Sequence, residues 1–178
     1  MADRDPFANA EELLRRVYAY VAYRVGNQSD AEDITSETFE RALRYRDGFD
    51  ERKGEPVAWL LGIARNCVYD ALLRPRARAA DEVPAAQPDV EAEVVGKLAL
   101  MEALATLSPS DRELLALRYG ADLSPREIGR LLDHTRNAVD VALSRARTRL
   151  AAALQQSEGQ PRTIDVAGLL TDLADRAL

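Results

Sequence analysis

The strongest constraint on the fold of this chain comes from residues 123–150, which read LSPREIGRLLDHTRNAVDVALSRARTRL. Ser124, followed by a proline and then by Glu127, is typical of a helix N-terminus, where the serine caps the helix and the glutamate completes a capping box. This helix is expected to end near Leu132, and Thr135 can cap a second helix after a short turn. The segment therefore predicts two helices joined by a tight turn.

The rest of the chain carries the same helical signal. Apolar residues recur at three- and four-residue spacings, and strand signals are nearly absent. We therefore expect an all-α fold of two small helical domains joined by a flexible linker. The expected divisions are a first domain over residues 8–78, a linker over 79–95, a second domain over 96–154, and a C-terminal extension over 155–178 whose apolar spacing is compatible with a short helix.

The first domain is expected to contain three helices. The second helix is predicted to start at Ser29 and the third at Pro56, since proline suits the first helical turn. On the second helix, Ile34, Thr38 and Leu43 are expected to face the core.

Charge is distributed unevenly in this acidic chain of net charge −6. Residues 56–78 contain four arginines and Asp70, which gives +3, and residues 136–150 contain four arginines and Asp140, which again gives +3. Basic helices of this kind can contact phosphates and guanine edges, and a recognition helix inserts its N-terminal residues into the major groove. The alternative for residues 123–150 is an ordinary helical hairpin with a solvated basic face.

Several classes of protein are disfavoured by what the sequence contains. Cys67 is the only cysteine and His134 the only histidine, so a disulfide, a cysteine-based zinc site and a histidine-based triad are not expected. No glycine-rich phosphate loop is present, and we predict that the protein is not an enzyme and needs no metal or cofactor. The charged N-terminus lacks an apolar core, and no apolar run approaches the roughly 20 residues of a membrane span, which predicts a cytoplasmic protein without membrane insertion.

Two sets of motifs resemble a known family. LSPSDRELLALRY, LSPREIGRLL and AVDVALSRARTRL are similar to region 4 of bacterial RNA polymerase sigma factors of the extracytoplasmic-function type (group IV), and DAEDITSETFERAL and WLLGIARNCVYDALLR are similar to region 2. The resemblance covers about residues 8 to 154. It implies a factor that binds core RNA polymerase and directs promoter recognition, promoter opening and transcription initiation.

The resemblance also implies roles for individual residues. The acidic helix of region 2 is expected to dock on the clamp helices of the largest polymerase subunit, and region 4 on the flap. Acidic side chains there suit a basic partner and steer association. The residues that match the docking surface are Asp30, Asp33, Glu37, Phe39 and Arg41.

A second group matches positions that contact the −10 promoter region. These are Phe49, Arg52, Lys53, Arg65, Asn66 and Arg74. The family captures an unpaired base at this element, and capturing it requires contacts that offset a few kcal/mol of lost stacking. Phe49 is either a stacking surface for that base or an anchor that holds its loop to the core, whereas Trp59 is expected to pack in the core.

The group assigned to the −35 region consists of Ser124, Arg136, Asn137, Asp140, Ser144, Arg145 and Arg147. The sequence departs from the family here, because members usually carry a Thr-Val-Lys-Ser-Arg-Leu-like run where this chain has Ala138 to Leu143. Asp140 would repel a phosphate but could accept a hydrogen bond from a cytosine amino group. Two other functions therefore stay open: a stand-alone helix-turn-helix regulator, and a sigma-like protein that acts by protein contacts with lost or altered −35 binding. An anti-sigma factor is a further partner that the resemblance allows.

Overall fold

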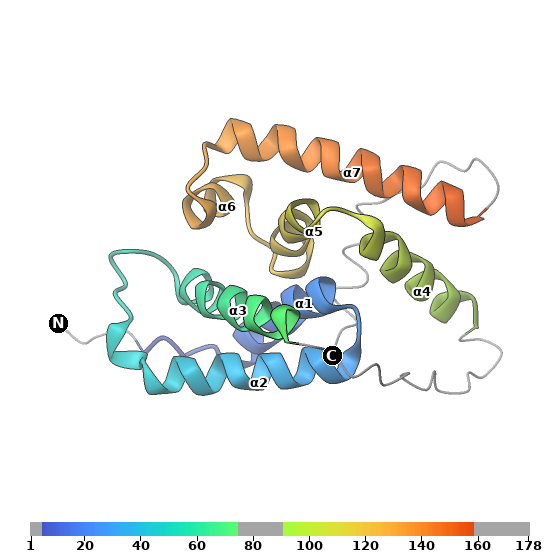
Figure 1. Ribbon diagram of the computed structural model, residues 1–178. Coiled ribbons are helices and arrows are strands. Elements are labelled where there is room, and N and C mark those ends of the chain that lie inside the picture. Colours follow the sequence, from blue (N-terminus) through green and yellow to red (C-terminus); the bar gives the residue numbers. More distant parts are fainter. Residues whose placement is uncertain (1–4, 75–90, 159–178) are drawn as a thin grey trace.

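The computed structural model describes residues 5–74 and 91–158, and within these ranges the regular structure is helical throughout (Figure 1). This confirms the predicted all-α fold. The first lobe contains α1 (Ala10–Val25), α2 (Gln28–Arg44), the short 3₁₀ helix η1 (Arg46–Gly48) and α3 (Pro56–Leu73). The second lobe contains α4 (Glu91–Thr106), α5 (Pro109–Leu115), the π-helical turn η2 (Ala116–Gly120), α6 (Pro125–Leu132) and α7 (Arg136–Glu158).

The three helices of the first lobe pack on one another through their apolar faces. On α2, Ile34 and Thr38 are buried as predicted, and the Thr38 hydroxyl donates to the Ile34 carbonyl oxygen at 2.8 Å. The prediction for Leu43 is wrong, because its side chain is 55% exposed near the end of the helix. The helix also starts earlier than predicted: Asn27 caps it by accepting from the Asp30 backbone N–H at 2.8 Å.

The helices α5 and α6 of the second lobe start in the same way, with a capping serine followed by a proline. Ser108 accepts from the Asp111 backbone N–H at 3.1 Å, and Pro109 occupies the first turn of α5. At α6, the Ser124 hydroxyl accepts from the Glu127 backbone N–H, while the Glu127 carboxylate accepts from the Ser124 backbone N–H at 2.8 Å. This reciprocal capping box confirms the prediction, since each side chain satisfies an amide that the helix itself leaves unpaired.

The helix-turn-helix is held together by apolar packing and a close backbone approach. Ile128 of α6 packs with Val139 and Leu143 of α7, and all three side chains are buried. Gly129 lies directly beneath the turn, so that a Cβ atom there would stand 2.6 Å from the His134 carbonyl oxygen. The position therefore requires glycine for steric reasons.

The two lobes pack directly against each other (Figure 1). Helix α1 contacts η2 and α5, and α3 contacts α6, so the buried residues of both lobes form one continuous core. Helix α4 begins at Glu91, and the last residues of the predicted linker are therefore helical. The rest of the predicted linker, residues 79–90, and most of the predicted extension, residues 159–178, lie outside the described residues. Among the described helices, none is both long enough and apolar enough to cross a membrane.

Candidate nucleic-acid and polymerase interfaces

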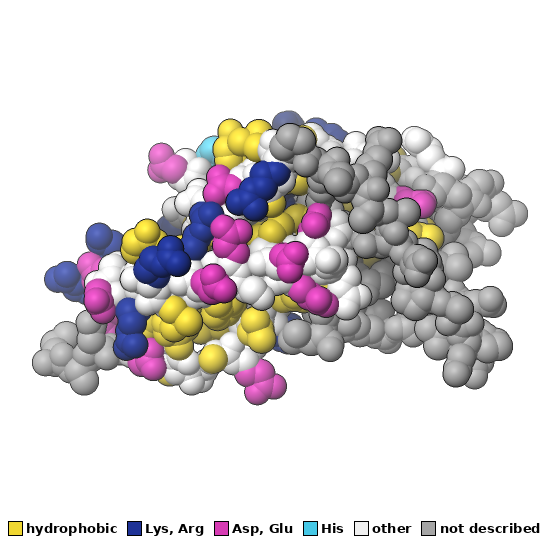
Figure 2. Space-filling model, turned by 60° about the horizontal axis from the view of Figure 1, so that its bottom comes forward, with side chains coloured by type: hydrophobic (Ala, Val, Ile, Leu, Met, Phe, Trp, Pro, Cys, Tyr) yellow, Lys and Arg dark blue, Asp and Glu magenta, His cyan; other side chains and the backbone are white. Residues whose placement is uncertain are grey.

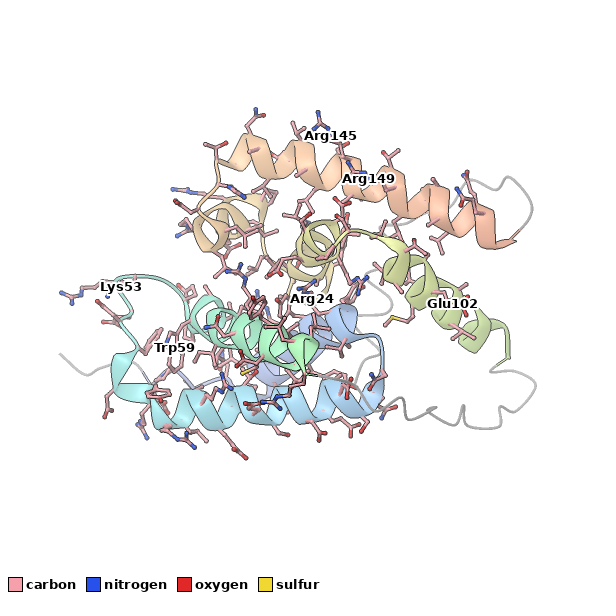
Figure 3. The ribbon with its side chains drawn as sticks, in the orientation of Figure 1. Arg24, Lys53, Trp59, Glu102, Arg145 and Arg149 are labelled. Carbon is pink, nitrogen blue, oxygen red and sulfur yellow. The ribbon has the colours of Figure 1, made fainter. Side chains whose placement is uncertain are left out.

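The first turns of α7 present the polar face that the sequence predicts for a recognition helix. Arg136, Asn137, Asp140 and Ser144 are exposed, and so are Arg145 and Arg147 further along the helix. Figure 3 shows Arg145 pointing away from the second lobe, where a bound duplex could reach it. Thr135 caps the helix by accepting from the Ala138 backbone N–H at 3.2 Å, which fixes the start of this face.

Two ion pairs reduce the positive charge that α7 can offer to DNA. The Arg136 Nε atom lies 3.5 Å from Asp140 Oδ2, so the aspartate partly neutralises the N-terminal end of the exposed face. Arg149, in contrast, turns toward α5 and donates to both carboxylate oxygens of Asp111 at 2.7 and 2.8 Å. Arg149 therefore serves the packing of the second lobe, although it lies on a basic helix.

Ser124 lies at the exposed start of α6, but its hydroxyl is engaged in the capping box. The Ser124 side chain and backbone N–H donate to the Glu127 carboxylate, and these hydrogen bonds hold the pKa of Glu127 below its ordinary value. The structure thus gives Ser124 a helix-capping role, and a contact to DNA stays a prediction.

The loop between α2 and α3 is anchored by aromatic packing. Phe49 is only 8% exposed, and its ring centroid lies 5.5 Å from that of Trp59. Trp59 also packs edge-on against Phe7, with centroids 6.3 Å apart. Of the two roles left open for Phe49, this burial favours the anchor, because most of the ring is not accessible for stacking. Trp59 is partly buried and packs against the core, as expected.

The cations predicted to contact the −10 region lie on the exposed side of this loop and along α3. Lys53 extends away from the protein (Figure 3). Asn66 is exposed on α3, and Arg74 is exposed directly after the end of that helix. Arg52 is exposed as well, and its Nε atom lies 2.9 Å from Asp50 Oδ1. The structure thus keeps most of this predicted group at the surface.

Arg65 is the exception in this group. Its Nε atom donates to Glu113 Oε1 of the second lobe at 2.8 Å, and its side chain is 36% exposed. The structure therefore shows this predicted DNA contact engaged within the protein.

Helix α2 carries the residues predicted to dock on polymerase, and Figure 2 shows acidic side chains spread over the face on that side of the molecule. Asp33 is exposed, whereas Asp30 accepts from the Asn27 side-chain amide at 2.8 Å. A Glu37–Arg41 ion pair lies one turn further on.

The remaining members of the docking set link α2 to its surroundings. Arg41 also contacts Asp70 of α3 at 3.2 Å, which connects the two helices. Phe39 is half-buried, with its ring centroid 6.5 Å from that of Phe7. The predicted set is therefore partly a free acidic surface and partly an internal polar network.

A cluster between the lobes was missed by the sequence analysis. Glu113 of α5 accepts from the Tyr20 hydroxyl at 3.1 Å and lies 3.1 Å from Arg24 Nη2. Burial and the nearby Glu113 carboxylate raise the pKa of Tyr20, so its hydroxyl stays protonated and donates. One signal in the sequence could have indicated it: Arg24 lies on the same side of its helix as the buried Val17 and Val21. A cation at a buried position is rarely found without a partner of opposite charge.

The fold and these surfaces define a two-lobed helical protein with a helix-turn-helix at one end, whose second helix, α7, is basic between Arg136 and Arg149. The Sigma-70 region 2 family matches residues 10–78, and the Sigma-70 region 4 family matches residues 97–150. The chain belongs to the extracytoplasmic-function RNA polymerase sigma factors, which are transcription initiation factors and not enzymes.

Characterised relatives agree with this assignment. The chain is 37% identical over 147 residues to the sigma factor BldN of Streptomyces coelicolor, a match that covers 78% of this chain and 56% of BldN. It is 34% identical over 164 residues to SigE of Mycolicibacterium smegmatis, covering 83% of this chain and 62% of SigE. It is 30% identical over 127 residues to SigK of Mycobacterium bovis, covering 66% of this chain and 68% of SigK. The chain thus spans less than two thirds of the length of BldN and SigE.

Two solved structures share the fold. The sigma factor RpoE of Bartonella quintana, solved in complex with the anti-sigma factor NepR, aligns with a TM-score of 0.61 at 21% identity, over 80% of this chain and 92% of that one. CnrH, solved in complex with the cytosolic domain of CnrY, aligns with a TM-score of 0.58 at 21% identity, over 86% of this chain and 99% of that one.

Proposed function

We propose that this protein binds core RNA polymerase in the cytoplasm and directs it to promoters whose −10 and −35 elements are read by the first and second lobes. The single observation that carries this proposal is the presence of regions 2 and 4, in that order, in one chain. A stand-alone regulator would need the helix-turn-helix alone. The region 2 match therefore favours a promoter-specificity subunit.

The acidic side of α2 is the proposed docking surface for the clamp helices of polymerase, and region 4 is proposed to reach the flap. Asp33 is its most accessible member, because it is exposed on the first turns of the helix, whereas Glu37 is already paired with Arg41. An exposed carboxylate that faces a basic partner accelerates association and penalises wrong partners.

Promoter contact is assigned to two exposed groups of side chains. In the first lobe these are Arg52, Lys53, Asn66 and Arg74, together with Arg65 once it leaves Glu113 and with Phe49 as the anchor of the loop. In the second lobe they are Arg136, Asn137, Asp140, Ser144, Arg145 and Arg147, with Ser124 holding the start of α6. Because the whole chain is acidic, we expect weak DNA binding by the free protein and strong binding only with polymerase.

An anti-sigma factor is also proposed as a partner. The support is that RpoE, which shares the fold of this chain, was solved with the anti-sigma factor NepR bound, and that CnrH was solved with the cytosolic domain of CnrY bound. Recovery of polymerase alone by affinity purification from uninduced cells would count against this partner.

The docking proposal is tested by measuring the affinity of core RNA polymerase for wild-type protein and for Asp33→Arg. We expect the substitution to weaken binding at least about tenfold, since it places a cation opposite a basic surface. Glu102→Arg is the matched control, because Glu102 is exposed on α4, well away from α2 (Figure 3). Equal affinity of Asp33→Arg and wild type would remove α2 from the interface.

A further inference from the structure

The end of α2 presents two arginines and a tyrosine that belong to none of the predicted groups. Arg44 is the last residue of α2, Tyr45 is its C-cap, and Arg46 is the first residue of η1. All three side chains are exposed. The Tyr45 side chain is 61% exposed, in contrast to that of Phe49 four residues later, which is 8% exposed. These three residues, called the tip below, therefore place an aromatic ring in solvent between two cations.

The backbone holds the tip in a fixed arrangement. The Tyr45 N–H donates to the Arg41 carbonyl oxygen at 3.0 Å, and the Tyr45 carbonyl oxygen accepts from the Gly48 N–H at 2.9 Å. The Phe49 N–H donates to the Arg46 carbonyl oxygen at 3.1 Å, and the Phe49 side chain is buried. A tyrosine on such a turn loses little conformational freedom on binding, because its side chain has only two torsions to fix.

The cations of the tip are available to an anionic partner. Among the residues that the structure describes, Arg44 and Arg46 form no ion pair, and neither does Lys53 on the following loop. Residues 44–53 contain four cations against three carboxylates, Asp47, Asp50 and Glu51. Asp50 is already engaged by Arg52 at 2.9 Å. The dipole of α2 accounts for a cation at Arg44 but not for Arg46, which lies beyond the helix.

The position of the tip indicates which part of a promoter it can reach. Helix α2 lies on the side of the first lobe away from the second lobe, and its C-terminal end is at the same end of the molecule as Lys53 (Figure 1, Figure 3). The second lobe is assigned to the −35 element, which is upstream of the −10 element. DNA that passes the loop of Lys53 and continues away from the second lobe therefore meets the tip downstream of the −10 element.

We propose that the tip binds the single-stranded non-template DNA directly downstream of the −10 element, with the Tyr45 ring stacked on a base and the two guanidinium groups on phosphates. Proteins that bind single strands without sequence preference combine stacking on aromatic side chains with cations that follow the backbone. The tip therefore stabilises the opened strand and does not read its sequence. The proposal rests on the proposed function for the identity of the DNA, but binding of a single strand by the tip does not depend on that function.

The tip is tested without polymerase by the binding of the full chain to a fluorescein-labelled oligothymidylate of about 12 nucleotides. Fluorescence anisotropy at several salt concentrations gives the affinity and its salt dependence. Tyr45→Ala should weaken binding about fivefold or more with an unchanged salt dependence, because it removes the stacked ring but no charge. Tyr45→Phe keeps the ring and should bind as wild type does.

Replacing both arginines of the tip has a different expected signature. The double variant Arg44→Ala and Arg46→Ala should reduce the slope of log K against log salt by about 1.4, since each phosphate contact of a single strand contributes about 0.7. An unchanged slope in this variant would show that the arginines do not contact phosphates. A wild-type chain without measurable affinity for the oligonucleotide even at low salt would also overturn the proposal.

Tyr69→Ala is the matched control. Tyr69 is 63% exposed on α3, but its neighbours in the chain are Val68 and Asp70, so it lacks flanking cations. Far-ultraviolet circular dichroism verifies that every variant is folded. The control should bind the oligonucleotide as wild type does, and equal losses for Tyr45→Ala and Tyr69→Ala would contradict a specific role of the tip.

Holoenzyme assays separate DNA binding from a protein contact. On a promoter fragment that is unpaired downstream of the −10 element, Tyr45→Ala should shorten the lifetime of the complex about fivefold, whereas affinity for core polymerase should not change. Variants that bind the oligonucleotide normally but lose affinity for core polymerase would make the tip a protein contact and overturn the proposal. Failure of the proposed function is distinguishable, because wild type would then yield no specific transcript while the anisotropy titration still decides whether the tip binds single strands.

Discussion

The substitution Asp140→Asn tests the charge of the recognition helix directly. In the structure the Asp140 carboxylate lies 3.5 Å from Arg136 Nε, and the two side chains are 45% and 74% exposed. An exposed pair of this spacing contributes only about 0.3–0.5 kcal/mol to stability. We therefore expect the free energy of unfolding to change by no more than about 0.5 kcal/mol.

The effect on DNA binding is expected to be larger. Asparagine releases the Arg136 guanidinium to contact a phosphate, and one added phosphate contact steepens the dependence of log K on log salt by about 0.9. Between about 50 and 200 mM salt, this single contact changes affinity by about 3.5-fold. The variant holoenzyme should therefore bind promoter duplex more tightly than wild type at low salt and lose more of that affinity as salt rises.

Fluorescence anisotropy of a labelled promoter duplex, titrated with holoenzyme at several salt concentrations, measures both quantities. Glu102→Gln changes the net charge by the same amount on a different helix and should leave the slope unaltered. A weaker complex with an unchanged slope would refute the reasoning and would indicate that Asp140 accepts a hydrogen bond from a base.

Three further predictions concern the second lobe and the core. Ser124→Ala should lower the free energy of unfolding by about 1 kcal/mol in a urea titration. Because the folded-state pKa of Glu127 is depressed, the stability from this capping box should be present above the ordinary pKa of glutamate and be lost as the pH falls through the lowered pKa. Gly129→Ala should destabilise the protein by about 1–3 kcal/mol and abolish −35 recognition, since its Cβ atom would stand 2.6 Å from the His134 carbonyl oxygen; unchanged thermal stability would contradict this contact. Cys67 is fully buried and burial raises its pKa, so its thiol should react with a disulfide reagent only after unfolding, and a rapid reaction in native buffer would be inconsistent with the structure.

The features that could be predicted from the sequence are local ones. The capping box of Ser124 and Glu127 depends on residues three positions apart, and the cap from Thr135 depends on the next turn of chain. Such interactions follow from the identity of near neighbours.

The features that were missed depend on distant parts of the chain. Arg65 and Glu113 are 48 residues apart, and no local pattern selects one carboxylate as the partner of a given arginine. The prediction that Leu43 faces the core was wrong. Three- and four-residue spacing identifies the apolar side of a helix, but it does not show how far along that side the neighbouring helices extend. The choice between the two roles left open for Phe49 likewise needed the path of the loop, which brings its ring to Trp59.

Run-off transcription tests the central claim most directly. Purified core RNA polymerase would be combined with the full chain on a pool of genomic promoter fragments, with polymerase alone as the control. Specific transcripts that require the protein, with upstream sequences sharing −10 and −35 elements, are the predicted result. Polymerase that binds the protein but yields no specific transcript, or that does not bind it at all, would contradict the account.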